Sequence, residues 1–336
     1  MTKKEHFEQL CAGKLSGPVL FRPILMHFAA RFNGNTYREF ASDYQVLVRS
    51  NLACMEYFET DLVGLISDPY RETSAFSAKI SFPEEAVPRC DEILIKTYDD
   101  VKNLKRPDVY QCERTLDRIR GAELFQKELK GEVPVIGWIE GPLAEACDLA
   151  GISNMLMQLM VDPDFASLLL DKCTQTAKDF AQAQIEAGCD IIGIGDAICS
   201  QIDQITYDHY IKARHLEIIS FIHDLGAKVK LHICGNITHL LPSLKDLGLD
   251  ILDIDFMVSL EQAFRILGPD VIRCGNINPV EIQDKTAGEI GEITSQLLEA
   301  EKGRKFILSA GCEITVNTPV RNLKIMKETI KNRTQE

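Results

Sequence analysis

The sequence predicts one fold class, a single (β/α)8 barrel that occupies residues 1–336 and carries helical and loop additions in its N-terminal part. Eight short apolar, β-branched runs recur along the chain, and after Ile139 they alternate regularly with stretches of helical period. Alternating strands and helices form βαβ units, and eight such units in a chain of this length are typical of a barrel. Glycines stand just past several helical stretches, as at Gly188, Gly226 and Gly248, where a helix end favours a left-handed residue.

The expected elements are named here by their residue ranges. The strands are expected at Val19–Met26, Leu62–Ile66, Val133–Ile139, Ile191–Ile194, Val229–Ile233, Ile251–Ile254, Val271–Cys274 and Phe306–Leu308. The clearest helical stretches are Phe165–Ala187, Tyr207–Leu225, Ile237–Leu247 and Ala287–Glu301. Roughly residues 1–60, together with residues 71–117, are expected to add helices and loops that cover the barrel mouth.

The composition restricts the partners and the compartment. The net charge of −13 argues against nucleic acid and anionic membranes as partners, because both need a basic surface. The chain has no run of about 18 apolar residues, and Met1–His6 is too polar for a signal peptide. Eleven cysteines spread along the chain are typical of free thiols in a reducing cytoplasm. We therefore expect a cytoplasmic protein without a disulfide framework.

Polar side chains follow almost every expected strand. In (β/α)8 barrels the chemistry takes place at the C-terminal ends of the strands. In chain order these ends carry His27, Asp68, Glu140, Asp196, His232 with Cys234, Asp255, Asn276 and Cys312. The pattern predicts a functional site at this end of the barrel.

The strongest of these signals is a split set of metal ligands. His232 and Cys234 follow one apolar run as His-Ile-Cys-Gly, and Cys312 follows another as Ser-Ala-Gly-Cys. One imidazole and two thiolates are three of the four ligands of a tetrahedral zinc ion, and an open fourth position is typical of a catalytic zinc site. Asp255 or Glu140 could fill that position or hydrogen-bond the free nitrogen of His232. The alternative is that both cysteines are buried apolar thiols and His232 is a core histidine.

A zinc site of this kind suits alkyl transfer to sulfur. A substrate thiol that enters the open position loses its proton, because the cation favours the thiolate. That thiolate remains nucleophilic toward a soft alkyl donor. The sequence therefore predicts a thiol-activating centre.

Two other strand ends have competing interpretations. Asp196 follows Gly193-Ile194-Gly195, which lacks the third glycine of a dinucleotide fingerprint. Its carboxylate could orient substrate or cap the helix that follows. Asn276 is expected in a turn, Gly275 to Pro279, that starts a helix.

The chain resembles the uroporphyrinogen decarboxylase family over essentially its whole length. The resemblance depends on the barrel order, on Ser67-Asp68, Glu140-Gly141-Pro142 and Gly275-Asn276-Ile277-Asn278-Pro279, and on the ending Leu308-Ser309-Ala310-Gly311-Cys312 with Thr318-Pro319. Within the family it is similar to the zinc-dependent methylcobamide:thiol methyltransferases, whose His-x-Cys and distant Cys match His232, Cys234 and Cys312.

This resemblance implies a function and a set of partners. Zinc would activate a thiol such as coenzyme M, and the methyl group would come from a corrinoid (methylcobamide) carried by a separate small corrinoid-binding protein. Asp68, Glu140 and Asp196 are the candidate catalytic residues. Asn276 is the candidate cofactor-binding residue, and Asp255 is a candidate fourth metal ligand.

Three alternatives remain open at this point. A tetrapyrrole decarboxylase would use Asp68 with arginines, but only Arg31 of the Arg-Gln-Ala-Gly-Arg signature is present, plus Arg22 upstream. A methyltransferase could instead run the first half-reaction, from a methyl donor to the corrinoid. A third possibility is zinc that only joins two strands. The glutamate ligand of the more distant cobalamin-independent methionine synthases has no counterpart, since Phe256 stands at the nearest position.

Overall fold

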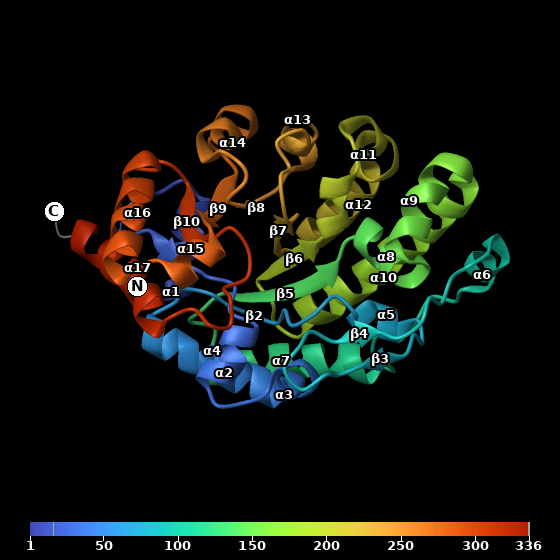
Figure 1. Cartoon of the computed structure of the whole chain (residues 1–336), viewed down its shortest axis with the longest axis horizontal. Coiled ribbons are helices and arrows are strands. Elements are labelled where there is room, and N and C mark those ends of the chain that lie inside the picture. Colours follow the sequence, from blue (N-terminus) through green and yellow to red (C-terminus); the bar gives the residue numbers. More distant parts are fainter. Residues whose placement is uncertain (16, 335–336) are drawn as a thin grey trace.

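The computed structural model describes residues 1–15 and 17–334, and its centre is a sheet of eight parallel strands surrounded by helices (Figure 1). The sheet order is β1-β10-β9-β8-β7-β6-β5-β2. The strands are β1 (Leu20–Phe21), β2 (Val63–Gly64), β5 (Val135–Glu140), β6 (Ile191–Gly195), β7 (Lys228–His232), β8 (Ile251–Ile254), β9 (Ile272–Ile277) and β10 (Phe306–Ala310). Each overlaps one expected apolar run, so the predicted barrel is confirmed.

The two ends of this sheet, β1 and β2, are joined by one residue. The backbone N–H of Asp61 donates to the carbonyl of Phe21 at 2.8 Å, and the N–H of Phe21 donates to Asp61 Oδ2 at 2.7 Å. Lys327 adds an ion pair to the same carboxylate at 2.8 Å. Asp61 therefore connects β1, which pairs with β10, to β2, which pairs with β5 at the other end of the sheet order.

Helices cover the outside of the strands and are connected to them in chain order. They are α2 (His27–Phe32), α3 (Tyr37–Ser42), α4 (Tyr44–Phe58), α7 (Glu113–Leu129), α8 (Pro142–Ala150), α9 (Ile152–Val161), α10 (Pro163–Glu186), α11 (Gln204–Tyr210), α12 (Lys212–Asp224), α13 (Leu241–Leu244), α14 (Leu260–Leu267), α15 (Pro279–Asp284), α16 (Ala287–Ala300) and α17 (Val320–Thr334). Short 3-10 helices occupy Ala197–Gln201 and Lys245–Leu247. The helix expected at Tyr207–Leu225 is divided at Ile211, and the one expected at Ile237–Leu247 is helical only from Leu241 on.

The first helix, α1 (Lys3–Cys11), lies at the opposite end of the barrel from the one expected. Its Phe7 and Leu10 pack against Leu20 and Ile136, which stand at or near the N-terminal ends of their strands, and the same apolar cluster includes Ile191. The expectation that the whole N-terminal part covers the mouth is therefore wrong for α1. The reason is its apolar face, which fills the bottom of the barrel.

The additions after β2 do reach the mouth. They comprise α5 (Arg71–Ala75), a hairpin of β3 (Ile80–Ser81) and β4 (Arg89–Cys90), and α6 (Tyr98–Asn103). Glu85, in the hairpin loop, contacts the ring of His27 at 3.1 Å, and His27 begins α2 just beyond β1. The prediction that the additions after β2 cover the barrel mouth is therefore confirmed where the hairpin contacts His27.

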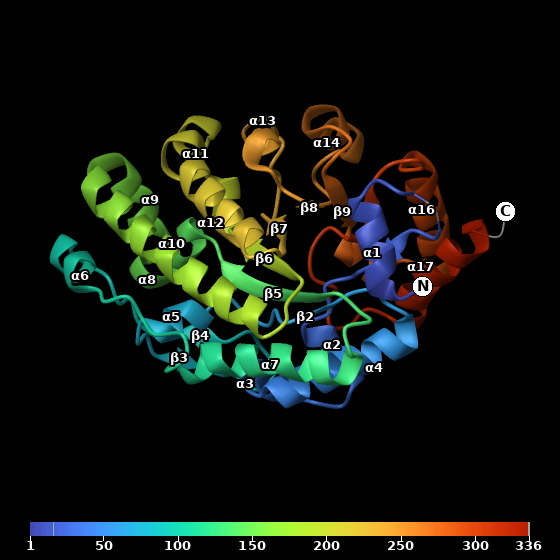
Figure 2. The same ribbon diagram turned by 180° about the vertical axis from the view of Figure 1, so that it is seen from behind.

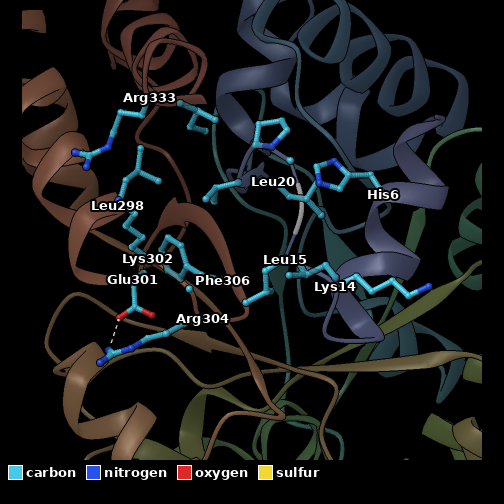
Figure 3. A pocket seen from close by; sticks show the side chains of 16 residues that line it. His6, Lys14, Leu15, Leu20, Leu298, Glu301, Lys302, Arg304, Phe306 and Arg333 are labelled. Atoms are coloured by element: carbon cyan, nitrogen blue, oxygen red, sulfur yellow. Dashed lines mark hydrogen bonds and ion pairs between the residues drawn. The ribbon is translucent and has the colours of Figure 1, made fainter. Parts of the chain in front are cut away.

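A cavity of about 520 Å³ opens beside α1 at the bottom of the barrel (Figure 3). Its lining includes Leu10 of α1, Leu20 of β1, Leu298 of α16, Phe306 of β10 and Arg333 of α17. Figure 2 shows α1 and α17 on this side of the molecule. The cavity therefore lies away from the strand ends that carry the predicted site.

Within the described residues, no helix is long and apolar enough to cross a membrane.

Candidate metal centre

The three predicted zinc ligands lie together at the C-terminal ends of β7 and β10. His232 Nε2 is 2.9 Å from Cys234 Sγ and 3.9 Å from Cys312 Sγ, and the two sulfurs are 3.5 Å apart. A tetrahedral zinc ion with ~2.3 Å to sulfur and ~2.0–2.1 Å to nitrogen separates its donors by about 3.6–3.8 Å. Among the described residues, the group of donor atoms within 4.8 Å of one another here contains these three alone. The sulfur–sulfur and His232–Cys312 separations are close to these values, whereas the His232–Cys234 separation of 2.9 Å is shorter by about 0.7 Å, so the three donors fit a zinc ion after this pair moves slightly apart.

Asp253 holds the imidazole of His232 in the orientation that this site needs. His232 Nδ1 donates to Asp253 Oδ2 at 2.8 Å, which leaves Nε2 turned toward the two sulfurs. Lys230 Nζ forms an ion pair with the same carboxylate oxygen at 2.9 Å. Carboxylates that accept from the second nitrogen of a ligating histidine fix its tautomer and raise its basicity. The sequence suggested Asp255 or Glu140 for this contact, and Asp253 makes it instead.

A signal for Asp253 was present in the sequence. It is the one charged residue inside the apolar run Ile251–Ile254, and it is 4% exposed in the structure. A carboxylate within a strand of the barrel needs a cation or donor on the same interior layer, which Lys230 and His232 supply from the neighbouring β7.

Protonation within the metal centre follows from these contacts. A hydrogen bond from Cys234 lowers the pKa of the Cys312 thiol to about 4, with His232 acting in the same direction, whereas the pKa of Cys234 is raised by the same hydrogen bond and by burial. Burial would lower the pKa of His232, but Asp253 and Cys312 outweigh it and raise that pKa to about 9. Burial would raise the pKa of Asp253, yet Lys230 and His232 hold it well below its usual range. In the absence of a metal, Cys312 is therefore the thiolate of the pair and lies beside a protonated His232, whereas Cys234 keeps its proton.

Asp255, predicted as a fourth ligand, stabilises the turn that carries Cys234. Its Oδ2 accepts the backbone N–H of Gly235 at 2.7 Å, and Gly235 has φ of +89°. The backbone at Asp255 also lies so close to Gly311 that a Cβ there would come within 3.0 Å of the Asp255 Cα. Both ligand-bearing turns therefore pack on Asp255, and its role as a ligand stays a prediction.

Asn276 lies within β9 and not in the turn expected after that strand. Its side-chain amide donates to the carbonyl of Val258 at 2.9 Å and approaches the carbonyl of Asp255 at 3.4 Å. These contacts hold the loop that follows β8. The cofactor-binding role predicted for Asn276 stays a prediction.

Asp68 and Glu140 stand at the ends of the adjacent strands β2 and β5, where two arginines neutralise them. We call Asp68, Glu140, Arg71 and Arg114 the arginine cluster. Arg114 Nη2 donates to Asp68 Oδ2 at 2.5 Å, and Arg71 Nη2 donates to Glu140 Oε1 at 3.0 Å. Despite burial, the two guanidinium groups hold the pKa of Asp68 well below its usual range, whereas burial raises the pKa of Glu140. The sequence pattern missed both arginines, because helices α5 and α7 bring them to the strand ends.

Trp138 connects the arginine cluster to the metal centre. Its Nε1 donates to Glu140 Oε1 at 3.1 Å, and its ring lies 5.9 Å from the imidazole of His232. A Cβ on Gly193 or Gly195 would come within 2.4 or 2.9 Å of the Trp138 ring. The two glycines of the rejected nucleotide motif therefore make room for the indole.

A family model described as uroporphyrinogen decarboxylase (URO-D) matches residues 2–333. The chain belongs to this family. A methylcobamide:CoM methyltransferase MtaA of Methanosarcina barkeri is 26% identical over 65% of this chain, a match that spans 64% of the length of that relative. A uroporphyrinogen decarboxylase of Trichlorobacter lovleyi is 26% identical over 98% of both chains. The solved structure of a methyltransferase from Methanosarcina mazei superimposes with a TM-score of 0.90 at 20% identity and covers 99% of both chains.

The residues suggested for a decarboxylase do not face one substrate site. Arg22 is buried inside the barrel, where its Nη1 has no hydrogen-bond partner among the described residues, and Arg31 Nη1 donates to Asn317 Oδ1 at 2.6 Å. The carboxylate of Asp68 already accepts from Arg114 and from the hydroxyl of Ser67 at 2.5 Å. These side chains are therefore not arranged as a shared set of free anion-binding groups.

Asp196 is completely buried and caps a different helix from the one expected. Its carboxylate accepts from the backbone N–H of Ala144 at 2.7 Å, at the start of α8, and from His215 Nε2 at 3.0 Å. Its own N–H donates to the carbonyl of His232 at 3.0 Å. The 3-10 helix that follows Asp196 has no side-chain cap, so that expectation is wrong: the carboxylate points back to α8, past Gly141.

A second group of donor atoms surrounds Asp196. Asp196, Cys199 and His215 lie within 4.8 Å of one another, and all three are buried. Tyr207 occupies His215 Nδ1 at 2.8 Å, and Asp196 occupies Nε2. Both ring nitrogens are engaged, so this group is a closed hydrogen-bonded network. The predicted catalytic role of Asp196 stays a prediction, while its contacts position the strand end that carries His232.

Proposed function

We propose that this chain is a zinc-dependent methyltransferase that transfers a methyl group from a methylated corrinoid, carried by a separate small protein, to a thiol. The observation that carries the proposal is the donor set of His232, Cys234 and Cys312 at one point of the barrel mouth, with Asp253 bonded to the second nitrogen of His232. Relatives named methylcobamide:CoM methyltransferase and methylated-thiol–coenzyme M methyltransferase support it.

The chain's own residues account for most of what the reaction requires. Zinc held by the three donors would lower the pKa of a bound thiol and keep its sulfur as a thiolate. Asp253 keeps the proton of His232 on Nδ1, so that the lone pair of Nε2 stays free to bind the metal ion. With zinc held by these residues, the thiolate sulfur would attack the methyl carbon of the corrinoid substrate: a sulfur–carbon bond would form, the carbon–cobalt bond would break, and its electron pair would stay on the corrinoid. The thiol proton leaves to solvent through the barrel mouth.

A decarboxylase acting on a tetrapyrrole is the alternative, because the relative from Trichlorobacter lovleyi spans nearly the whole chain. That reaction needs free cationic groups for several substrate carboxylates. Here Arg71 and Arg114 are paired with Glu140 and Asp68. The donor set and the paired arginines therefore favour methyl transfer. The same centre would also serve the first half-reaction, in which a methyl group moves from a donor to the corrinoid. The direction of methyl transfer distinguishes that reaction from transfer to a thiol.

The test is Cys312→Ala with Cys112→Ala as the matched control, since Cys112 lies at the start of α7 outside the donor set. We expect Cys312→Ala to lose bound zinc and to reduce methyl transfer from free methylcobalamin to thiols by more than ~100-fold, because direct ligands contribute more than their supporting carboxylates. Circular dichroism and thermal unfolding should remain near wild type. A Cys312→Ala protein that keeps both zinc and activity contradicts the proposal, and Cys112→Ala should keep both.

A further inference from the structure

Residues 71–95 form a strap that begins with helix α5, passes through the β3–β4 hairpin and returns to helix α8 (Figure 1). At its start, the hydroxyl of Thr73 on α5 donates to Glu145 Oε2 on α8 at 3.0 Å. At its end, the backbone N–H of Ile95 donates to the carbonyl of Leu149 on α8 at 3.0 Å. Helix α8 therefore holds both ends of the strap.

The hairpin in the middle of the strap contacts the barrel mouth and the arginine cluster. Glu85 contacts the ring of His27 at 3.1 Å, and the centre of the Phe82 ring lies 4.9 Å from Arg114 Cζ. The position of the strap therefore determines how open this side of the mouth is.

Three carboxyl groups meet where α5 packs on α8, and we call Glu72, Glu145 and Asp148 the carboxyl trio. Glu72 and Glu145 are each 1% exposed, and Glu145 and Asp148 lie one turn apart on the same face of α8. Thr73, next to Glu72 in the chain, bonds Glu145, and the charges of Glu72 and Asp148 both act on Glu145. Each group of the trio has one oxygen that is buried without a hydrogen-bond partner among the described residues. The three groups are thus within reach of one another and incompletely satisfied.

The carboxyl trio has little positive charge to balance it. Arg71 Nε is 3.9 Å from Glu72 Oε2, too far for a hydrogen bond, and Arg71 also pairs with Glu140. Arg114, the other cation of the arginine cluster, pairs with Asp68. A buried carboxylate without a counter-charge is costly, so such groups bind protons instead of remaining ionised.

Protons fit this position better than a metal ion does. Among the described residues, the trio does not form a group of donor atoms within 4.8 Å of one another. Burial raises the pKa of all three groups, and the neighbouring carboxylates raise the pKa of Glu145 and Asp148 further. The other titratable or charged groups that face the trio are Asp68 and Tyr70 before the strap, Arg71 on α5, Cys90 of β4, Glu140 of β5, Cys147 of α8, Cys173 of α10 and Asp196 after β6. Arg71 is the one cation of this set.

We propose that the carboxyl trio is a pH-sensitive latch that fastens the strap to α8 while its carboxyl groups are protonated and releases the strap when they ionise. Neutral carboxyl groups pack and donate hydrogen bonds across the interface of α5 and α8, whereas ionised ones repel one another there. Release of the strap opens the side of the mouth next to the arginine cluster. This device controls access to the mouth whichever reaction takes place there.

The direction of the pH dependence follows from proton linkage. The fastened strap holds its carboxyl protons more tightly than the released strap, in which these groups are solvated and have their ordinary pKa. The stability that the latch adds is therefore complete at acidic pH and is lost as the pH rises toward the raised pKa values. In that range, release becomes about tenfold more favourable per pH unit for each proton lost.

Hydrogen–deuterium exchange of the full chain, followed by mass spectrometry from about pH 6.5 to about pH 8.5, tests the latch. Protection of peptides from residues 71–95 is compared with that of α16, and each value is divided by the exchange of the unfolded peptide at the same pH. The double variant Glu145→Gln/Asp148→Asn keeps the shape of the neutral groups and cannot ionise at these positions. Glu123→Gln, on an exposed position of α7, is the matched control.

We expect the protection of the strap in wild type to fall at least about tenfold over this range, while that of α16 changes less than about twofold. The double variant should reduce the fall in the strap to less than about threefold, and Glu123→Gln should behave as wild type. At about pH 7, the infrared carbonyl band of protonated carboxyl groups should be present in wild type and weaker in the double variant.

Strap protection that does not change with pH in wild type overturns the inference. An equal fall in wild type and in the double variant also overturns it, because other groups then titrate, and so does a parallel fall in α16, which indicates global unfolding. Absence of the protonated-carboxyl band from wild type overturns it in favour of a bound cation as the counter-charge. If the double variant does not fold, Glu145→Gln and Asp148→Asn are measured singly, and a pH dependence unchanged in both overturns the latch.

Discussion

The metal centre and the arginine cluster occupy the same end of the barrel but satisfy their polar groups in opposite ways. In the cluster, Asp68 and Glu140 are neutralised inside the protein by Arg114 and Arg71. In the metal centre, the two sulfurs and Nε2 of His232 contact one another, and Cys312 also accepts a hydrogen bond from the backbone N–H of Glu313. The comparison teaches that a closed charge network positions the barrel, whereas sulfur and imidazole donors gathered at one point supply the ligands that a metal ion needs.

The largest effect on stability is expected in the arginine cluster. Arg71 is fully buried, so Arg71→Met leaves Glu140 and part of the charge of Asp68 without a partner, and we expect a loss of about 3–5 kcal/mol in the free energy of unfolding. Arg265→Met is the matched control, because its ion pair with Glu261 is exposed and should contribute less than about 1 kcal/mol.

Urea unfolding monitored by circular dichroism measures both variants, with zinc content determined on the folded protein. The comparison predicts that Arg71→Met protein that remains folded still binds zinc through His232, Cys234 and Cys312. Loss of zinc in parallel with stability would mean that the two regions act as one unit, and a stability equal to that of Arg265→Met would contradict the closed network.

The two regions also differ in how far the sequence predicts them. His232, Cys234 and Cys312 could be predicted because short spacing and a strand end bring each ligand to the mouth, and all eight strands were found from apolar runs. Arg71 and Arg114 could not, because their position depends on how α5 and α7 pack, which no local pattern encodes. The same limit applies to α1, whose amphipathic sequence does not say which end of the barrel it covers.

Asp253 and Asp255 show the same limit at the scale of one strand. They are two residues apart and thus on one side of the chain, and only the contact with His232 distinguishes the supporting carboxylate from the one that holds the Gly235 turn. The sequence favoured the residue at the strand end. The barrel places the one inside the strand, Asp253, beneath the imidazole.

A smaller effect is expected for zinc affinity. Asp253→Asn removes the negative charge that His232 Nδ1–H faces and leaves Lys230 without its ion pair, so zinc should bind about 10–100-fold more weakly. Competition with a chromogenic chelator measures the affinity, and Asp255→Asn is the matched variant. Equal weakening by both would support Asp255 as a ligand, whereas an unchanged affinity in Asp253→Asn would contradict its supporting role.

The smallest effect is a spectroscopic one that reports on both regions at once. Trp138 is the only tryptophan, and it contacts Glu140 of the cluster through Nε1 and faces His232 across 5.9 Å. Without zinc, the pKa of His232 is raised to about 9, so near pH 7 its ring is an imidazolium that quenches a nearby indole. Zinc binding at Nε2 displaces that proton, and zinc has a closed shell that does not quench. We therefore expect a modest rise in Trp138 emission on titration with zinc.

Two variants show whether the change in Trp138 emission comes from the metal centre or from the arginine cluster. Cys312→Ala, which lacks a metal ligand, should show no zinc-dependent change, whereas Arg71→Met should alter the starting emission through Glu140 and keep the zinc-dependent rise. The same rise in Cys312→Ala would mean that zinc acts away from the predicted ligands. Loss of the rise in a folded, zinc-binding Arg71→Met protein would mean that the arginine cluster sets the protonation of His232 through Trp138. The closed network would then be part of the metal centre and not only its support.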